Sequence, residues 1–86
     1  MKVRVPTPLR SYTERKGEVE ATASTLADLP WDLDRRYPGL RFRIVTEQDE
    51  IREHIKIFVN QEQVHKLAVP LQPADEVQII CALSGG

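Results

Sequence analysis

The sequence predicts a single α+β domain in which a mixed sheet of four to five strands is covered by one main helix. The chain has 86 residues, of which 41% are hydrophobic and 29% are charged. This is enough for one small, compact core. Short runs that alternate apolar and polar residues stand on both sides of a single apolar stripe with helical spacing. The predicted order is therefore strand, strand, helix and then three or four further strands.

The first two strands are expected near the beginning of the sequence. Residues 2–5 alternate polar and apolar side chains, and Pro6 ends this run because proline cannot donate a hydrogen bond to a neighbouring strand. A second alternating run follows Gly17 and continues to Ala23. Together the two runs predict a hairpin with a long connection.

The main helix is expected from Leu29 to Tyr37. Leu29, Leu33 and Tyr37 recur every four residues, which places them on one face of a helix. Pro30 falls in the first turn, where proline is tolerated, and an additional turn is expected just before it. Pro38-Gly39 is a typical helix end.

Four runs after the helix are candidate strands. In the run 41–46, Phe42 and Ile44 would share one face of the sheet. The polar segment 47–53 that follows is expected to be a loop. The remaining candidates are residues 55–59, 64–67 and 76–83, with a turn at 60–62 between the first two.

The last run is nearly continuous in apolar residues from Val77 to Leu83. Such a run is typical of an interior strand. If it pairs in parallel with the first strand, the helix packs across one face of the sheet. Order and pattern then predict a β-grasp arrangement, whereas periodicity alone predicts only the α+β class.

Composition argues against several functional classes. The formal net charge is −1, whereas proteins that bind nucleic acid usually carry a basic excess. The apolar runs are too short for a signal peptide or a membrane span, so we expect no membrane partner. Cys81 is the only cysteine, so no internal disulfide can form, and this favours a cytoplasmic location.

Several short motifs together resemble the ubiquitin-like sulfur carriers. This family includes the small subunit of molybdopterin synthase, the carrier of thiamine biosynthesis and a carrier for cysteine synthesis. The resemblance spans nearly the whole chain and agrees with the β-grasp arrangement. The matching segments are residues 8–10, 37–40, 55–60, 73–77 and 82–86.

The resemblance implies a carrier rather than an enzyme, with a β-grasp domain at residues 1–83 and a flexible reactive tail at residues 84–86. A ubiquitin-activating-type adenylyltransferase would use ATP to adenylate the carboxylate of Gly86, and the carrier itself would bind no cofactor. Sulfur would then replace AMP to give a thiocarboxylate. A second enzyme would take this sulfur, with the large subunit of molybdopterin synthase as the leading candidate and cysteine or thiamine synthesis as alternatives.

The last residues suit such chemistry. Gly85 and Gly86 lack a Cβ atom and can thread a narrow channel, while Ser84 connects them to Leu83 at the end of the last strand. Two other classes remain open. The chain could be a protein modifier that joins Gly86 to lysine amines, or a binding module with an inert tail.

Alternation also predicts a docking surface. If Ile57 and Ile79 face the core, Phe58 and Ile80 point to the opposite face of the sheet. Clustered apolar side chains on a surface commonly mark an interaction site. We therefore expect Phe58 and Ile80 to contact the partner enzymes.

Other residues are expected to have structural roles. Cys81 has the parity of a buried residue, and Trp31 is expected to pack near the start of the helix. The two histidines have no partners at metal-ligand spacing, so we expect no metal site. Four arginines form a local basic group that is expected to be a solvated face, namely Arg35, Arg36, Arg41 and Arg43.

Overall fold

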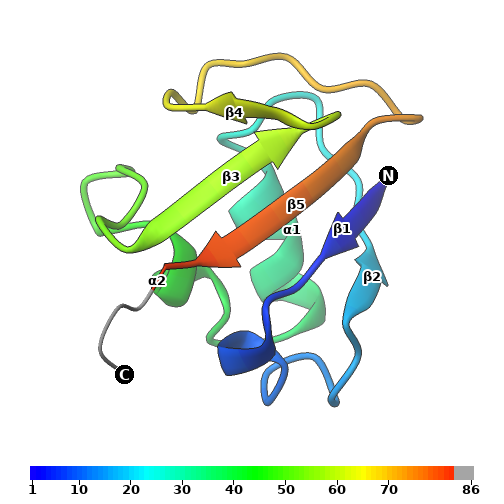
Figure 1. The fold of residues 1–86 in the computed structure, drawn as a ribbon, viewed down its shortest axis with the longest axis vertical. Helices are drawn as coiled ribbons and strands as arrows, with labels where there is room; N and C mark the ends of the chain where they lie inside the picture. The colour runs from blue at the N-terminus through cyan, green and yellow to red at the C-terminus, as the bar shows by residue number, and fades with distance from the viewer. Residues whose placement is uncertain (83–86) are drawn as a thin grey trace.

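The computed structural model describes residues 1–82 and confirms a mixed five-stranded sheet with the main helix across one face (Figure 1). The strands lie in the order β2-β1-β5-β3-β4. Only the central pair, β1 and β5, is parallel, and all other neighbours are antiparallel. The elements are β1 Lys2–Arg4, the 3-10 helix η1 Thr7–Leu9, β2 Glu18–Glu20, α1 Leu29–Arg36, α2 Arg41–Ile44, β3 Ile55–Val59, β4 Glu62–Val64 and β5 Glu76–Cys81.

The core lies between the sheet and α1. The inward residues of the three central strands include Val3, Ile57 and Val77, each at most 1% exposed. Leu33 of α1 is fully buried against them. At about 0.8 kcal/mol per buried CH₂ group, this layer is the main source of stability, and it fixes β5 at the centre of the sheet.

The main helix begins at Leu29, as the sequence predicts, and ends at Arg36, one residue before the predicted end at Tyr37. Pro30 lies in its first turn, where the missing N–H group costs no helical hydrogen bond. The preceding turn also forms, since the Asp28 N–H group donates to the Thr25 carbonyl oxygen at 3.1 Å. Gly39 has a φ angle of +96°, which side chains with a Cβ atom rarely adopt, and it directs the chain from α1 into α2.

The predicted strand at 41–46 is wrong, because residues 41–44 form the short helix α2. The strand prediction placed Phe42 and Ile44 on one face. In the structure Phe42 is 49% exposed, whereas Ile44 and Leu40 are at most 1% exposed. Burial at positions four apart is the helical period. Only Val45 forms a bridge, with Ile51, across the loop that was expected at 47–53.

The return strand begins earlier than predicted, at Glu62 rather than Val64. Asn60 and Gln61 have φ angles of +51° and +73°, which are typical of a two-residue hairpin turn. Val59 therefore pairs directly with Glu62, and the strand ends at Val64.

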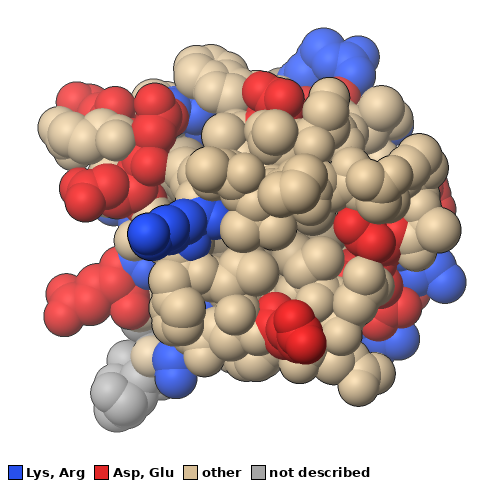
Figure 2. Space-filling model, turned by 90° about the horizontal axis from the view of Figure 1, so that it is seen from above, with Lys and Arg blue, Asp and Glu red and all other residues tan. Residues whose placement is uncertain are grey.

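The segment that follows β4 contributes a largely uncharged area to one side of the molecule. Residues 67–74 contain no charged side chain, and Figure 2 shows a largely uncharged centre on the side seen from above, with charges toward the edges. This side adjoins the start of β5 (Figure 1). In the described part of the chain, no helix is long and apolar enough to cross a membrane.

Candidate functional site

The point where β5 ends is the root of the predicted reactive tail. Cys81 pairs with Ile55, and the Ala82 N–H group donates to the His54 carbonyl oxygen at 2.7 Å. These contacts hold the chain at the edge of the body up to residue 82. The predicted tail residues Leu83, Ser84, Gly85 and Gly86 lie outside the described residues, so their role stays a prediction.

Phe58 and Ile80 have the orientation that alternation predicts. The inward residues Ile57 and Ile79 are at most 3% exposed, while Phe58 and Ile80 on the opposite parity are half-buried. Phe58 pairs with Gln78, one step along the same face from Ile80. This places the two side chains at diagonal positions on neighbouring strands, within reach of each other. Their role in docking stays a prediction.

A shallow groove runs beside Ile80 on the way to the tail root. It is lined by the end of β1, by η1 and by Gln78 to Cys81 of β5. Arg10 lines it too and is held in place because its Nε atom donates to the Val5 carbonyl oxygen at 3.0 Å. The position of Gly17 also matters, since a Cβ atom there would lie 2.9 Å from the Arg10 guanidinium. Sequence reasoning assigned no site role to Arg10, although it belongs to the matching segment 8–10.

Cys81 is half-buried rather than fully buried. It packs against the edge of the core, as its parity predicts, but it also lines the groove beside Ile80. The thiol therefore lies close to the tail root. No contact in the described part of the chain assigns it a chemical role.

Two of the segments that carried the family resemblance meet at the start of β5. The Asn60 side chain donates to Asp75 at 2.9 Å and accepts a hydrogen bond from the Glu76 N–H group at 3.0 Å. Asp75 also accepts from the Gln72 N–H group at 2.7 Å. The bonds from Gln72 and Asn60 lower the pKa of Asp75. These residues therefore shape the fold and fix where β5 begins.

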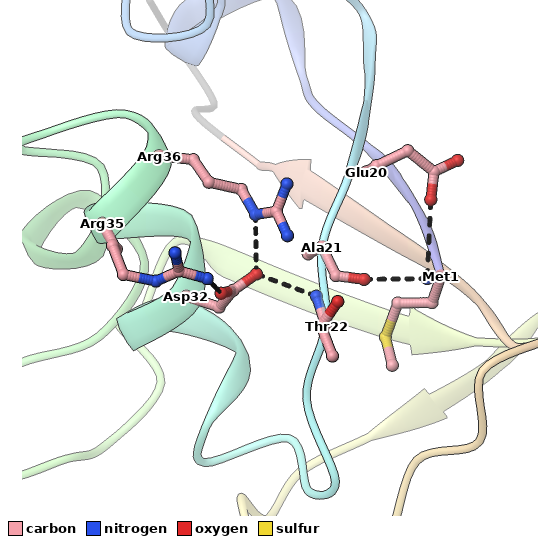
Figure 3. A network of polar contacts seen from close by, with 7 residues as sticks. All are labelled: Met1, Glu20, Ala21, Thr22, Asp32, Arg35 and Arg36. Carbon is pink, nitrogen blue, oxygen red and sulfur yellow. Dashed lines mark hydrogen bonds and ion pairs between the residues drawn. The ribbon is translucent and has the colours of Figure 1, made fainter.

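Asp32 joins α1 to the end of β2 (Figure 3). Its carboxylate accepts hydrogen bonds from the Thr22 N–H group at 2.8 Å and from Arg36 Nε at 2.9 Å, and it also contacts Arg35. Burial raises the pKa of this carboxyl group, but the bond from Thr22 and the two arginines outweigh burial and lower the pKa to about 2. Asp32 is therefore ionised at neutral pH and acts as a structural brace.

The basic group is not a uniform solvated face, which corrects the sequence expectation. Arg35 and Arg36 pair with Asp32. Arg41 is only 6% exposed, and its Nη2 atom lies 2.7 Å from Asp49. Helix α2 turns Arg41 inward, which a strand at this position would not have done.

Trp31 also differs from expectation, because it is 56% exposed. One face of its ring covers the Arg41 guanidinium, whose central carbon lies 3.8 Å from the ring centroid.

Both histidines are exposed. Within residues 1–82, no group of three or more His, Cys, Asp or Glu side chains could hold a metal ion.

Residues 3–86 match the ThiS family. The chain belongs to the ThiS family. Among its relatives is the sulfur carrier protein CysO of Mycobacterium bovis, 32% identical over 89 residues that cover 98% of this chain and 96% of CysO. The predicted membership in the ubiquitin-like sulfur carriers is thereby confirmed.

Similar solved structures agree with the assignment of this chain to the ThiS family. The complex of BexX and CysO from Amycolatopsis orientalis contains a chain with a TM-score of 0.91 and 31% identity, with coverage of 99% of this chain and 98% of that one. The small archaeal modifier protein 1 of Methanosarcina acetivorans has a TM-score of 0.81 and 26% identity, with coverage of 99% and 94%. These neighbours confirm the predicted β-grasp fold. They are small carrier or modifier proteins, as the prediction of a carrier rather than an enzyme requires.

Proposed function

We propose that this sulfur carrier of the ThiS and CysO type works through a thiocarboxylate at Gly86. A ubiquitin-activating-type enzyme would join the Gly86 carboxylate to AMP and release pyrophosphate from ATP. A sulfide-level donor would then attack the acyl carbon, with AMP as the leaving group. The observation that carries this proposal is the match of residues 3–86 to the ThiS family, together with the 32% identity to CysO.

The body of the protein supports this role through the position of β5. This strand lies at the centre of the sheet, and its last described residues end at the edge of the body, beside the half-buried Ile80 and the Arg10 groove. A partner that docks on Phe58 and Ile80 would therefore meet the tail root at the same time. In this proposal the carrier supplies the acyl group and the partner supplies ATP binding and catalysis.

For the destination of the sulfur, we propose cysteine synthesis rather than molybdopterin. Two of the three relatives reported above carry the name CysO, which favours the cysteine alternative from the sequence. We also place the reaction in the cytoplasm, in keeping with the single cysteine. The direct comparison is to offer the thiocarboxylated carrier to a cysteine-forming synthase and to a molybdopterin synthase large subunit, and to measure which one consumes it.

The central experiment is intact mass measurement after incubation with the activating enzyme, ATP and a sulfur source. Replacement of one oxygen by one sulfur supports the proposal. Two variants serve as controls. Deletion of Gly86 should abolish the mass change without loss of the folded state. Cys81→Ser should leave it unchanged, which excludes oxidation of the thiol as the source of the mass change. No mass change with a proven activating enzyme would contradict the proposal.

A second candidate function is protein modification, and the similarity to the small archaeal modifier protein favours it. In that case the activated Gly86 would form an amide with a lysine amine of another protein. The same reaction in the presence of cell extract separates the two functions. Conjugates of higher mass that disappear on Gly86 deletion would support the modifier.

A further inference from the structure

The helical side of the molecule carries an exposed aromatic patch. Trp31 is 56% exposed and Phe42 is 49% exposed, and they are the exposed large hydrophobic residues of the described chain. The Arg41 guanidinium carbon lies 3.8 Å from the Trp31 ring centroid and 5.3 Å from that of Phe42. The two rings are therefore parts of one surface that is built around a buried arginine.

Arg41 is held rigidly beneath this patch. Its Nη2 atom is 2.7 Å from Asp49, and its buried Nε atom has no hydrogen-bond partner within residues 1–82. A buried polar atom without a partner costs free energy. Exposed aromatic rings that rest on a fixed arginine have the composition of an interaction site, since Trp and Arg are enriched among residues that dominate binding energy.

The patch extends to the tail root. Phe42, Arg43, Arg52 and His54 line one shallow pocket. Arg52 connects α2 to this pocket, because its N–H group donates to the Ile44 carbonyl oxygen at 3.0 Å and its side chain donates to the Phe42 carbonyl oxygen. The His54 carbonyl oxygen in turn accepts the bond from Ala82. In the view of Figure 1, α2 and the end of β5 overlap, and the bond from Ala82 to His54 joins this pocket to the tail root.

The two arginines of this pocket have no acidic partner within the described residues, a property that they share with Arg10 and Arg15. Within the described residues, neither Arg43 nor Arg52 forms an ion pair, whereas the arginines on β1, α1 and beneath the patch each do. Arg43 donates instead to the Tyr12 hydroxyl group at 2.6 Å. The neighbouring loop carries acidic residues, of which Asp49 is engaged by Arg41. The other acids in this loop, Glu47, Glu50 and Glu53, are exposed and make no ion pair in the described chain.

We propose that Trp31, Phe42, Arg43 and Arg52 form a second docking surface, called here the α2 surface, for the enzyme that activates the tail. This inference rests on the proposed function. An extended chain of four residues spans at most about 14 Å, so an enzyme that encloses Gly86 must approach the root closely. It would then contact Ile80 on the sheet side and Phe42 on the helical side. The unpaired arginines define the complementary partner surface, which is an apolar pocket flanked by carboxylates.

The test is the affinity of the full chain for its activating enzyme, measured by calorimetry at low and moderate salt. Phe42→Ala and Arg43→Glu should each weaken binding about tenfold, a typical effect for a residue central to an interface. Lys66→Glu is the matched control, because it makes the same charge change on an exposed residue of the segment after β4. Added salt should weaken binding of the unaltered chain more than binding of Arg43→Glu.

The outcomes separate this inference from the proposed function. Unchanged affinity of both variants, with normal thiocarboxylate formation by the unaltered chain, overturns the α2 surface and leaves the carrier function intact. Failure of the unaltered chain to gain sulfur overturns the function itself. If Phe42→Ala instead abolishes self-association and leaves enzyme affinity unchanged, the patch binds a second copy and the proposal is wrong. If Phe42→Ala unfolds the chain, the affinity of Arg43→Glu and the salt dependence of binding test the α2 surface.

Discussion

The two ends of β5 are held in very different ways. At its start, Asn60, Asp75 and Glu76 are linked by side-chain and backbone hydrogen bonds, and Arg4 lies 3.2 Å from Glu76. At its end, Ala82 is held by the single bond from its N–H group to His54 among the described contacts. The ladder with β3 continues to Cys81, so the two ends differ in the side-chain contacts that reinforce the start of the strand. The end that leads to the proposed reaction has fewer such contacts, which suits a segment that we propose to enter another protein.

The largest expected effect comes from the body of β5 between these ends. Ile79→Ala removes a side chain that is 3% exposed and should lower the free energy of unfolding by about 3 kcal/mol. Ile80→Ala is the matched control on the opposite face and should cost less than about 1 kcal/mol. Urea titration measures both. Equal losses would show that the two faces of β5 are not distinguished by burial.

The start of β5 is tested by Asn60→Ala. This change removes both side-chain bonds to Asp75 and Glu76, and places alanine at a φ angle of +51°. We expect a loss of about 2 kcal/mol in unfolding free energy. Asn60→Gly tolerates the φ angle and removes only the bonds, so it should cost less. If both variants are as stable as the unaltered chain, the start of β5 is not anchored by this residue.

The pH dependence of stability tests the contacts of Asp32, which joins α1 to the end of β2. The pKa of Asp32 is lowered from 3.8 to about 2 in the folded state. Because the pKa of Asp32 is lower in the folded chain than in the unfolded chain, its full contribution to the free energy of unfolding is present above the unfolded-state pKa. This contribution is lost as the pH falls from about 4 to about 2. After allowance for screening of the exposed Arg35, we expect a contribution of about 1–2 kcal/mol. Asp32→Asn should remove this part of the pH dependence, as measured by urea unfolding at pH 2 to 6.

The smallest effect is expected at the end of β5. Ala82→Pro removes the N–H group that donates to His54 and should cost about 0.5–1.5 kcal/mol. Thermal unfolding compares it with Asn60→Ala under the same conditions. A larger loss for Ala82→Pro than for Asn60→Ala would reverse the comparison between the two ends.

Much of the fold is predictable from the sequence because alternation and helical spacing are local signals. The inward and outward parity of β3 and β5, including Phe58 and Ile80, follows directly from burial of every second residue. Helix α1 was predictable from its leucine spacing and from Pro30 in its first turn.

The secondary-structure predictions fail where tertiary contacts, rather than local sequence patterns, determine the structure. In residues 41–46, apolar and basic residues alternate like those of a strand, yet burial of Leu40 and Ile44 against the core imposes a helix. The burial of Arg41 and the exposure of Phe42 depend on this helix, so the α2 surface could not be predicted either. The chemistry that we predict for Gly86 rests on the resemblance to the sulfur carriers, because local sequence patterns do not indicate a reaction.

The parallel pairing of β1 and β5 has a consequence for how the protein is made. Lys2 pairs with Glu76, so the central contact of the sheet joins residues that lie almost a whole chain length apart. Contacts of such long range form late and slow the folding of a small domain. A nascent or truncated chain that lacks β5 has no partner for the inner edge of β1. The folded state therefore requires the strand from which the tail extends, and incomplete copies would not compete for the activating enzyme that we propose.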